Sequence, residues 1–269
     1  MNIVVCIKQV PDTTDVKINP ETNTLIREGV ASIINPFDAY ALEEAVRLKE
    51  KFGGTVNVMS MGPPQAEVSL RDAIALGADE AYLLSDRAFA GSDTLATAYA
   101  LASGIRKLGG VDVILMGRQA IDGDTGQVGP ETAENLGCPH LTDVRKIESV
   151  EADGTIVLQR MLEEGYVRIK VKAPVVITVV KEINEPRLPS LRGKMNAKKK
   201  EINTWTAADM EVEPKRLGLT GSPTQVVKIF TPPKPSGGKI FEGSVTENVK
   251  DLIAELKSAG ILLGHGKGE

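Results

Sequence analysis

The part of the sequence with the clearest chemical potential is a Gly-rich segment, residues 117–130. It follows an apolar run and carries Gly123, Gly126 and Gly129 at every third position. Glycines between a strand and a helix let backbone N–H groups converge on a phosphate, and the start of the helix adds a favourable dipole. The spacing matches neither GxGxxG nor the P-loop. On spacing alone, a tight turn and a ligand cradle fit this segment equally well.

Two acids within the Gly-rich segment indicate which part of a ligand it would hold. Asp122 and Asp124 would repel a phosphate at close range. A carboxylate at either position would instead accept a hydrogen bond from a ribose hydroxyl. A nucleotide is therefore the ligand that this segment favours, if it binds one.

A second candidate lies in residues 91–97, at the start of a predicted helix. Thr94 and Thr97 are three residues apart, so their hydroxyls face one side of the first helical turn. With the free N–H groups of that turn, they could hold a pyrophosphate oxygen. Capping of the helix by Ser92 or Asp93 explains the same residues without a ligand, and this segment by itself favours capping.

Other residues at predicted strand ends and helix starts could also face a ligand. Asn35, Phe37 and Asp38 lie where a helix begins, and there composition requires only an N-cap. Cys6 and Met61 end apolar runs and could touch a ring, although buried Cys and Met usually belong to the core.

A basic stretch forms the fourth candidate, and we call residues 184–205 the docking segment. Most basic loops are simply solvated. Here, however, exposed apolar residues lie among the charges, which is typical of a surface that docks a partner. The residues expected to make that contact are Leu191, Met195, Lys198, Lys199 and Lys200.

The elements that must position these residues alternate in type. Aromatic residues make up only 4% of the chain, so the core is aliphatic, as suits a parallel sheet buried on both faces. Helices are expected after Asn35, over 65–76 and after Ser92, each ending at glycine. Strands are expected at 3–7, 56–60, 81–84, 113–116 and 175–180. This pattern predicts an α/β fold with a doubly wound, mostly parallel open sheet, Rossmann-like, whose ligand lies at the carboxyl ends of the strands.

Composition changes along the chain predict three parts. Residues 1–183 form the α/β domain, in which 10–34 is a loop or short hairpin and 141–172 adds antiparallel strands. The docking segment follows. Residues 206–269 are rich in proline and predict an extended arm with a last helix at 245–258, and such an arm usually needs another chain to lie on.

Composition also excludes several classes of function. The net charge of −4 argues against a nucleic-acid surface, and two distant cysteines and two histidines offer no basis for a metal site, a disulfide framework or triad chemistry. No side chain is expected to act as a catalyst. Without a signal peptide or a long apolar run, a soluble cytoplasmic protein with no membrane span is expected.

Four stretches, in order along the chain, together resemble the beta subunit of electron-transferring flavoproteins. They are residues 5–11 (VCIKQVP), 35–45 (NPFDAYALEEA), 119–122 (QAID) and 184–200 (NEPRLPSLRGKMNAKKK). The resemblance implies an alpha subunit as obligate partner, an FAD carried by the pair, and a flavoprotein dehydrogenase docked on the Leu191 region. It also implies that the C-terminal arm packs on the alpha subunit.

The family divides over the nucleotide held by this subunit. One branch holds structural AMP. In the electron-bifurcating branch a second FAD accepts a hydride from NADH, and a low-potential acceptor such as ferredoxin or flavodoxin takes part of the electrons. Residues 91–97 and 122–130 resemble the bifurcating pattern, except that Gly126 stands where Ala is expected.

The bifurcating assignment implies a set of nucleotide contacts. They are Cys6, Asn35, Phe37, Asp38, Met61, Thr94, Thr97, Arg118, Asp122, Gly123, Asp124, Thr125, Gly126, Gln127 and Val128. Two alternatives stay open at this point. One is a non-bifurcating electron carrier with structural AMP, and the other is a redox-inactive ATP- or AMP-binding module of the stress-protein type.

Overall fold

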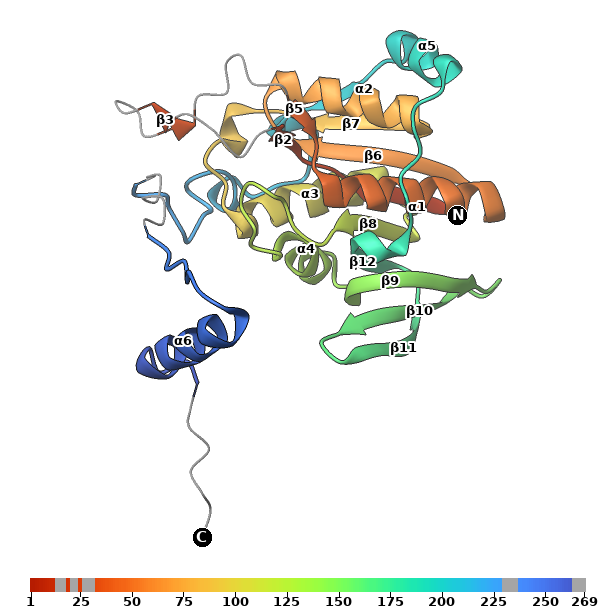
Figure 1. Ribbon diagram of the computed structural model, residues 1–269. Coiled ribbons are helices and arrows are strands. Elements are labelled where there is room, and N and C mark those ends of the chain that lie inside the picture. Colours follow the sequence, from red (N-terminus) through yellow and green to blue (C-terminus); the bar gives the residue numbers. More distant parts are fainter. Residues whose placement is uncertain (13–17, 20–23, 26–31, 229–236, 263–269) are drawn as a thin grey trace. The chain divides into compact units, whose positions relative to one another are not determined.

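The computed structural model describes residues 1–12, 18–19, 24–25, 32–228 and 237–262 (Figure 1). The chain divides into two compact units, Met1–Ile229 and Phe230–Glu269. This division differs from the predicted start of an arm at residue 206. None of the helices in the described ranges has the length and apolar character needed to span a bilayer.

The first unit is built on a nine-stranded sheet with the order β11-β10-β9-β12-β8-β1-β6-β7-β13. All pairs from β9 to β13 across the sheet are parallel, which confirms the predicted doubly wound, mostly parallel fold. The strands are β1 (Asn2–Cys6), β6 (Thr55–Met61), β7 (Glu80–Leu84), β8 (Val113–Gly117), β9 (His140–Val150), β10 (Thr155–Leu162), β11 (Gly165–Lys172), β12 (Val175–Val179) and β13 (Asn203–Trp205).

The winding direction of the sheet reverses beside β1. The chain moves from β1 to β6 and β7 on one side and then returns to place β8 on the other side. The carboxyl ends of β1 and β8 are therefore the topological switch point, where open α/β sheets bind ligands.

Helices cover both faces of the sheet (Figure 1). Alternate residues of β1 enter two separate cores: Ile3 and Val5 pack with α1 and α2, whereas Val4 and Cys6 pack with α3 and α4. Burial on both faces explains the aliphatic composition of the strands. The helices are α1 (Pro36–Phe52), α2 (Glu67–Leu76), α3 (Thr94–Leu108) and α4 (Val128–Leu136), with short 3-10 turns at Pro64–Ala66, Arg87–Phe89, Lys181–Ile183, Ala207–Asp209 and Pro214–Arg216.

Residues 10–34 lie partly outside the described ranges, so the predicted loop or hairpin is visible only in pieces. Two short antiparallel pairs are present, β2 (Gln9–Pro11) with β5 (Ser32–Ile34) and β3 (Ile18–Asn19) with β4 (Thr24–Leu25).

The strands expected within 141–172 are present, and two of the three extend the sheet in the antiparallel direction. β10 is antiparallel to β9 and β11. β9 itself pairs in parallel with β12 because it follows α4 in a further crossover.

The docking segment differs from the predicted loop. It contains α5 (Leu191–Lys199) and then β13, which pairs with β7. The Ser190 hydroxyl caps α5 by accepting a hydrogen bond from Gly193 N at 3.0 Å. Gly193 also allows α5 to approach α2, since a Cβ there would lie 2.2 Å from Ala75 O. Capping and tertiary packing, neither evident in the basic composition, order this stretch.

Residues 206–228 belong to the first unit and are bonded to α3 and its N-cap. Glu213 N donates to the Tyr99 hydroxyl at 2.8 Å, and Asp93 accepts from Thr224 N at 3.0 Å. Only the second unit could then be an arm. It contains α6 (Val245–Ser258), which has the predicted bounds, a Ser244–Glu247 capping box, and exposed apolar side chains including Val249 and Leu252. Packing of α6 on an alpha subunit stays a prediction.

Gly129 should be essential to the packing of α4. A Cβ at this position would lie 2.3 Å from the Thr178 methyl carbon on β12. Gly129→Ala should therefore lower the Tm by roughly 2–12 °C, the equivalent of about 1–3 kcal/mol of overpacking. Calorimetry of the purified protein measures this.

Gly123→Ala is the matched control, because a Cβ at Gly123 meets no atom within 4 Å. An equal loss of Tm in both variants would contradict the packing argument.

Candidate functional site

Asp38 joins the two sides of the switch point. It lies in the first turn of α1 and is 6% exposed. One carboxylate oxygen accepts from Lys8 N at 2.7 Å, and the other accepts from Gly117 N at 3.1 Å. These two N–H groups lie at the carboxyl ends of β1 and β8. A Cβ at Gly117 would lie 2.4 Å from the same carboxylate, so the close approach depends on glycine there.

Asn35 extends this connection into the Gly-rich segment. Its side chain is fully buried, donates to Gln119 O at 2.9 Å and accepts from Ile121 N at 3.1 Å. Asn35 is the N-cap residue of α1, as predicted, but its side chain forms no capping hydrogen bond. The amide instead shapes the turn that follows β8. Asn35 and Asp38 therefore position the Gly-rich segment, since their polar atoms are already bonded to the backbone.

Burial controls the ionisation of the groups below the site. It raises the pKa of Asp38 to about 7, although hydrogen bonds from Lys8, Asn35 and Gly117 oppose the rise. Burial, with the nearby Asp38 charge, raises the pKa of the Cys6 thiol to about 12. Cys6 is 5% exposed and packs in the core with Met59 and Ile114. It is a neutral core thiol, and half-buried Met61 packs against the same cluster.

The Gly-rich segment begins with a tight turn. Ala120 O accepts from Gly123 N at 3.3 Å and from Asp124 N at 2.8 Å. Asp124 and Gly126 then adopt positive φ values of 58° and 66°. Asp tolerates this left-handed conformation better than most residues, whereas Ala at 126 would be strained. The conformation explains why this chain has Gly where the resemblance led us to expect Ala.

Within the Gly-rich segment, the turn leaves most of the predicted contact residues exposed. Exposed residues are Arg118, Asp122, Gly123, Asp124, Thr125 and Gln127, and half-buried residues are Gly126 and Val128. Phe37 is half-buried at the start of α1. The segment is therefore a tight turn, as one interpretation predicted, and the residues expected to hold a ligand under the other interpretation lie on that turn.

A lysine that the sequence argument missed changes the charge of the site. Lys8 Nζ lies 2.6 Å from Asp122 Oδ1. Arg118 lies 3.3 Å from Asp143, and the Gln119 amide contacts Asp124. The local negative charge is thus smaller than the sequence indicated. The position of Lys8, two residues after the end of β1 at the switch point, was the signal that could have identified it.

The start of α3 adjoins the start of α4. Asp93 caps α3 by accepting from Ala96 N at 3.1 Å, which agrees with the capping interpretation. Thr94 does not cap α3; its hydroxyl donates to Glu131 Oε1, in the first turn of α4, at 3.2 Å. The other oxygen of Glu131 is buried without a partner among the described residues, and burial raises the pKa of this acid. Half-buried Thr97 lies one turn further along α3.

The N-terminus of α4 completes the site. In the described structure no side chain caps this nine-residue helix at Gln127. Free N–H groups and the helix dipole favour an anion there. Hydroxyls, carboxylates and helix N–H groups around one switch point are the groups that recognise the ribose and phosphates of a nucleotide.

The docking residues do not join this site. Leu191 and Met195 are exposed on α5, which packs against α2, with Lys198 and Lys199 exposed beside them. Lys200 is not a free cation, because it pairs with Glu80. The two predicted surfaces are therefore separate parts of the first unit.

Replacing Asp38 by Asn should remove the part of the protein's pH-dependent stability that comes from the Asp38 carboxyl. The folded-state pKa of about 7 lies above the ordinary value of 3.8. Stability contributed by this carboxyl is thus fully present below about pH 4 and is lost as the pH rises from there to the folded-state pKa of about 7. The Tm of the parent should fall relative to that of Asp38→Asn between about pH 4 and about pH 7.

Calorimetry across this range measures the difference in Tm. Asp12→Asn, at an exposed position, is the control and should follow the parent. A difference between the parent and Asp38→Asn that does not change with pH would contradict the assignment.

Comparison with known proteins identifies the family to which the chain belongs. Residues 22–210 match the family model described as the electron transfer flavoprotein domain. An electron transfer flavoprotein subunit beta from Thermoanaerobacterium thermosaccharolyticum is 57% identical over 97% of this chain and 100% of its own length. That of Clostridium acetobutylicum is 52% identical, covering 96% and 98%.

The name of a third relative describes it as a subunit of a complex. The caffeyl-CoA reductase-Etf complex subunit CarD of Acetobacterium woodii is 50% identical over 97% of this chain and 100% of its own length. The sheet, the switch-point site and these full-length similarities lead to one conclusion: the chain belongs to the beta subunits of the electron transfer flavoprotein family, which work with an alpha-subunit partner.

Proposed function

We propose that this beta subunit binds FAD at the β1–β8 switch point. It passes electrons from NADH to the FAD of the alpha subunit and to a flavoprotein dehydrogenase, with a low-potential acceptor such as ferredoxin or flavodoxin taking the other share. The observation that carries the proposal is the meeting of the Gly-rich segment with the starts of α3 and α4, through the 3.2 Å Thr94–Glu131 bond.

The residues of the site fit the parts of such a cofactor. The uncapped start of α4 and the hydroxyls of Thr94 and Thr97 suit a pyrophosphate. Asp122 and Asp124 suit ribose hydroxyls, and Gly126 adopts the left-handed conformation that the loop needs to surround a ligand. When bound, the flavin supplies the hydride and single-electron chemistry.

The chain itself supplies position and electrostatics. The Cys6 thiol is neutral and enclosed in the core, and Asp38 is bonded to two backbone N–H groups, so neither is free to act on a substrate. Lys8 offsets the charge of Asp122 and lets a phosphate approach more closely. This division of labour suits an electron carrier.

Features of the docking segment support a partner dehydrogenase. Leu188, Leu191 and Met195 are 90%, 79% and 57% exposed. The exposed cations Arg192 and Lys194 lie between them in the sequence. An apolar pocket bordered by acidic side chains would complement this surface. The name of the Acetobacterium woodii relative, which places that protein in a complex with a reductase, supports the same kind of association here.

Counting the cofactors of the purified heterodimer tests the nucleotide assignment. The proposal requires two FAD per heterodimer, released by denaturation and quantified by chromatography. One FAD with one AMP would overturn the bifurcating role and favour a carrier with structural AMP. A colourless complex would favour a redox-inactive nucleotide-binding module.

Leu191→Ala should weaken docking without changing flavin content. Loss of a central apolar anchor should raise the apparent KM for the partner dehydrogenase roughly tenfold, the equivalent of about 1.4 kcal/mol. Steady-state electron transfer at several dehydrogenase concentrations measures the change.

Leu219→Ala is the matched control, since Leu219 is 54% exposed but lies outside the docking segment. Loss of flavin in Leu191→Ala would mean that this residue is structural instead.

A further inference from the structure

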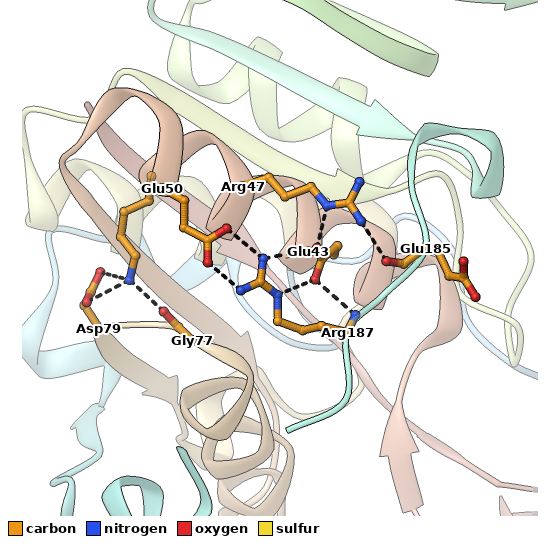
Figure 2. Close-up of polar contacts among 8 residues, drawn as sticks. Glu43, Arg47, Glu50, Gly77, Asp79, Glu185 and Arg187 are labelled. Carbon is orange, nitrogen blue, oxygen red and sulfur yellow. Dashed lines mark hydrogen bonds and ion pairs between the residues drawn. The ribbon is translucent and has the colours of Figure 1, made fainter. Parts of the chain in front are cut away.

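The first residues of the docking segment form hydrogen bonds with α1. Asn184 Nδ2 donates to Tyr40 O and to Glu44 Oε2, both at 3.0 Å. The Arg47 guanidinium then donates to Glu185 O at 3.0 Å (Figure 2). Three consecutive turns of one helix thus hold the backbone that leads to α5.

Arg187 completes this attachment. Its backbone N and its Nε donate to one oxygen of Glu43 at 3.1 and 2.8 Å, and its two terminal nitrogens donate to Glu50 at 2.6 and 3.0 Å (Figure 2). Glu43 is only 4% exposed. Burial alone would raise the pKa of Glu43, but hydrogen bonds from Arg187 and Arg47 lower it. A planar guanidinium can satisfy both glutamates at once, which a lysine cannot.

The N-terminal end of α1 carries the anchors of the nucleotide site. Asp38 and Asn35 hold Lys8, Gly117 and the turn of the Gly-rich segment. Asp38 and Glu50 are separated by twelve helical positions, or about 18 Å at 1.5 Å per residue. One helix therefore contacts both predicted functional surfaces.

We propose that α1 fixes the position of the docking segment relative to the Gly-rich segment, and that Arg187 is the positioning residue at the docking end. The proposal rests on the proposed function, because a defined separation matters only if a bound cofactor exchanges electrons with a docked partner. Arg187 directly precedes Leu188, the most exposed of the apolar docking residues at 90%. Its attachment therefore sets where this side chain is presented.

The second half of the docking segment has independent anchors on α2 and β7. Arg71 donates to Ala197 O at 2.7 Å and to Lys200 O at 3.0 Å, and β13 pairs with β7. Loss of Arg187 should consequently release residues near Leu188 while α5 and the sheet remain folded. The substitution can thus test position separately from folding.

Distance measurement by pulsed electron resonance tests the proposal in the complete heterodimer. Spin labels are attached at Leu188→Cys and Gln127→Cys in a Cys138→Ser background, and the complex without introduced cysteines supplies the correction. Arg187→Met should broaden the 127–188 distance distribution roughly twofold, and Arg187→Lys should broaden it less.

Arg192→Met is the matched control, because Arg192 lies in the same segment and makes no ion pair with the described residues. It should leave the distribution unchanged. A distribution in Arg187→Met as narrow as in the parent, or equal broadening in both variants, would overturn the proposal.

A second label pair, at Gln127→Cys and Lys51→Cys near the end of α1, reports on the rest of the fold. It should stay narrow in Arg187→Met, and broadening there would also overturn the positioning role. These distances require neither a dehydrogenase nor a known nucleotide. Failure of the positioning role is thereby distinguished from failure of the proposed function.

Discussion

The buried carboxylate of Asp38 is the interaction on which the site depends. At a topological switch point the connections leave adjacent parallel strands in opposite directions, so backbone N–H groups at the strand ends lose their sheet partners. Asp38 accepts from one such group on each side, at Lys8 and at Gly117. An unsatisfied buried N–H costs about 1–3 kcal/mol, so the carboxylate stabilises the crevice as well as shaping it. The same burial desolvates the Asp38 carboxyl and raises its pKa.

The start of α1 also fixes the conformation of the Gly-rich segment. Asn35 bonds to Gln119 and Ile121, and the turn that follows places exposed polar groups beside the starts of α3 and α4. The middle and the far end of α1 hold the docking segment through Glu43 and Glu50. A site of electron transfer needs fixed geometry more than reactive side chains. The scarcity of histidine and cysteine is consistent with this requirement.

Several elements were predictable because their signals are local. Aliphatic runs gave the positions of β1, β6, β7, β8 and β12, and glycines marked the ends of α1, α2 and α3. The bounds of α6 followed from a helical apolar stripe, and the structure adds a capping box at its start. Other features depend on contacts between distant residues. The ordered α5 relies on Arg71 and on the close approach at Gly193, and neither signal is visible in a run of lysines.

The sequence by itself determined the fold class, the succession of most strands and helices along the chain, and the Gly-rich segment as a candidate for holding a ligand. It could do so because hydrophobic period, caps and glycines act over a few residues. Only the tertiary structure decided the roles within the site. Asn35 and Asp38 form hydrogen bonds with the chain, and Lys8 pairs with Asp122 across 114 positions of sequence. Such roles follow from which polar groups burial leaves without water, and that is set by the packing of the whole domain.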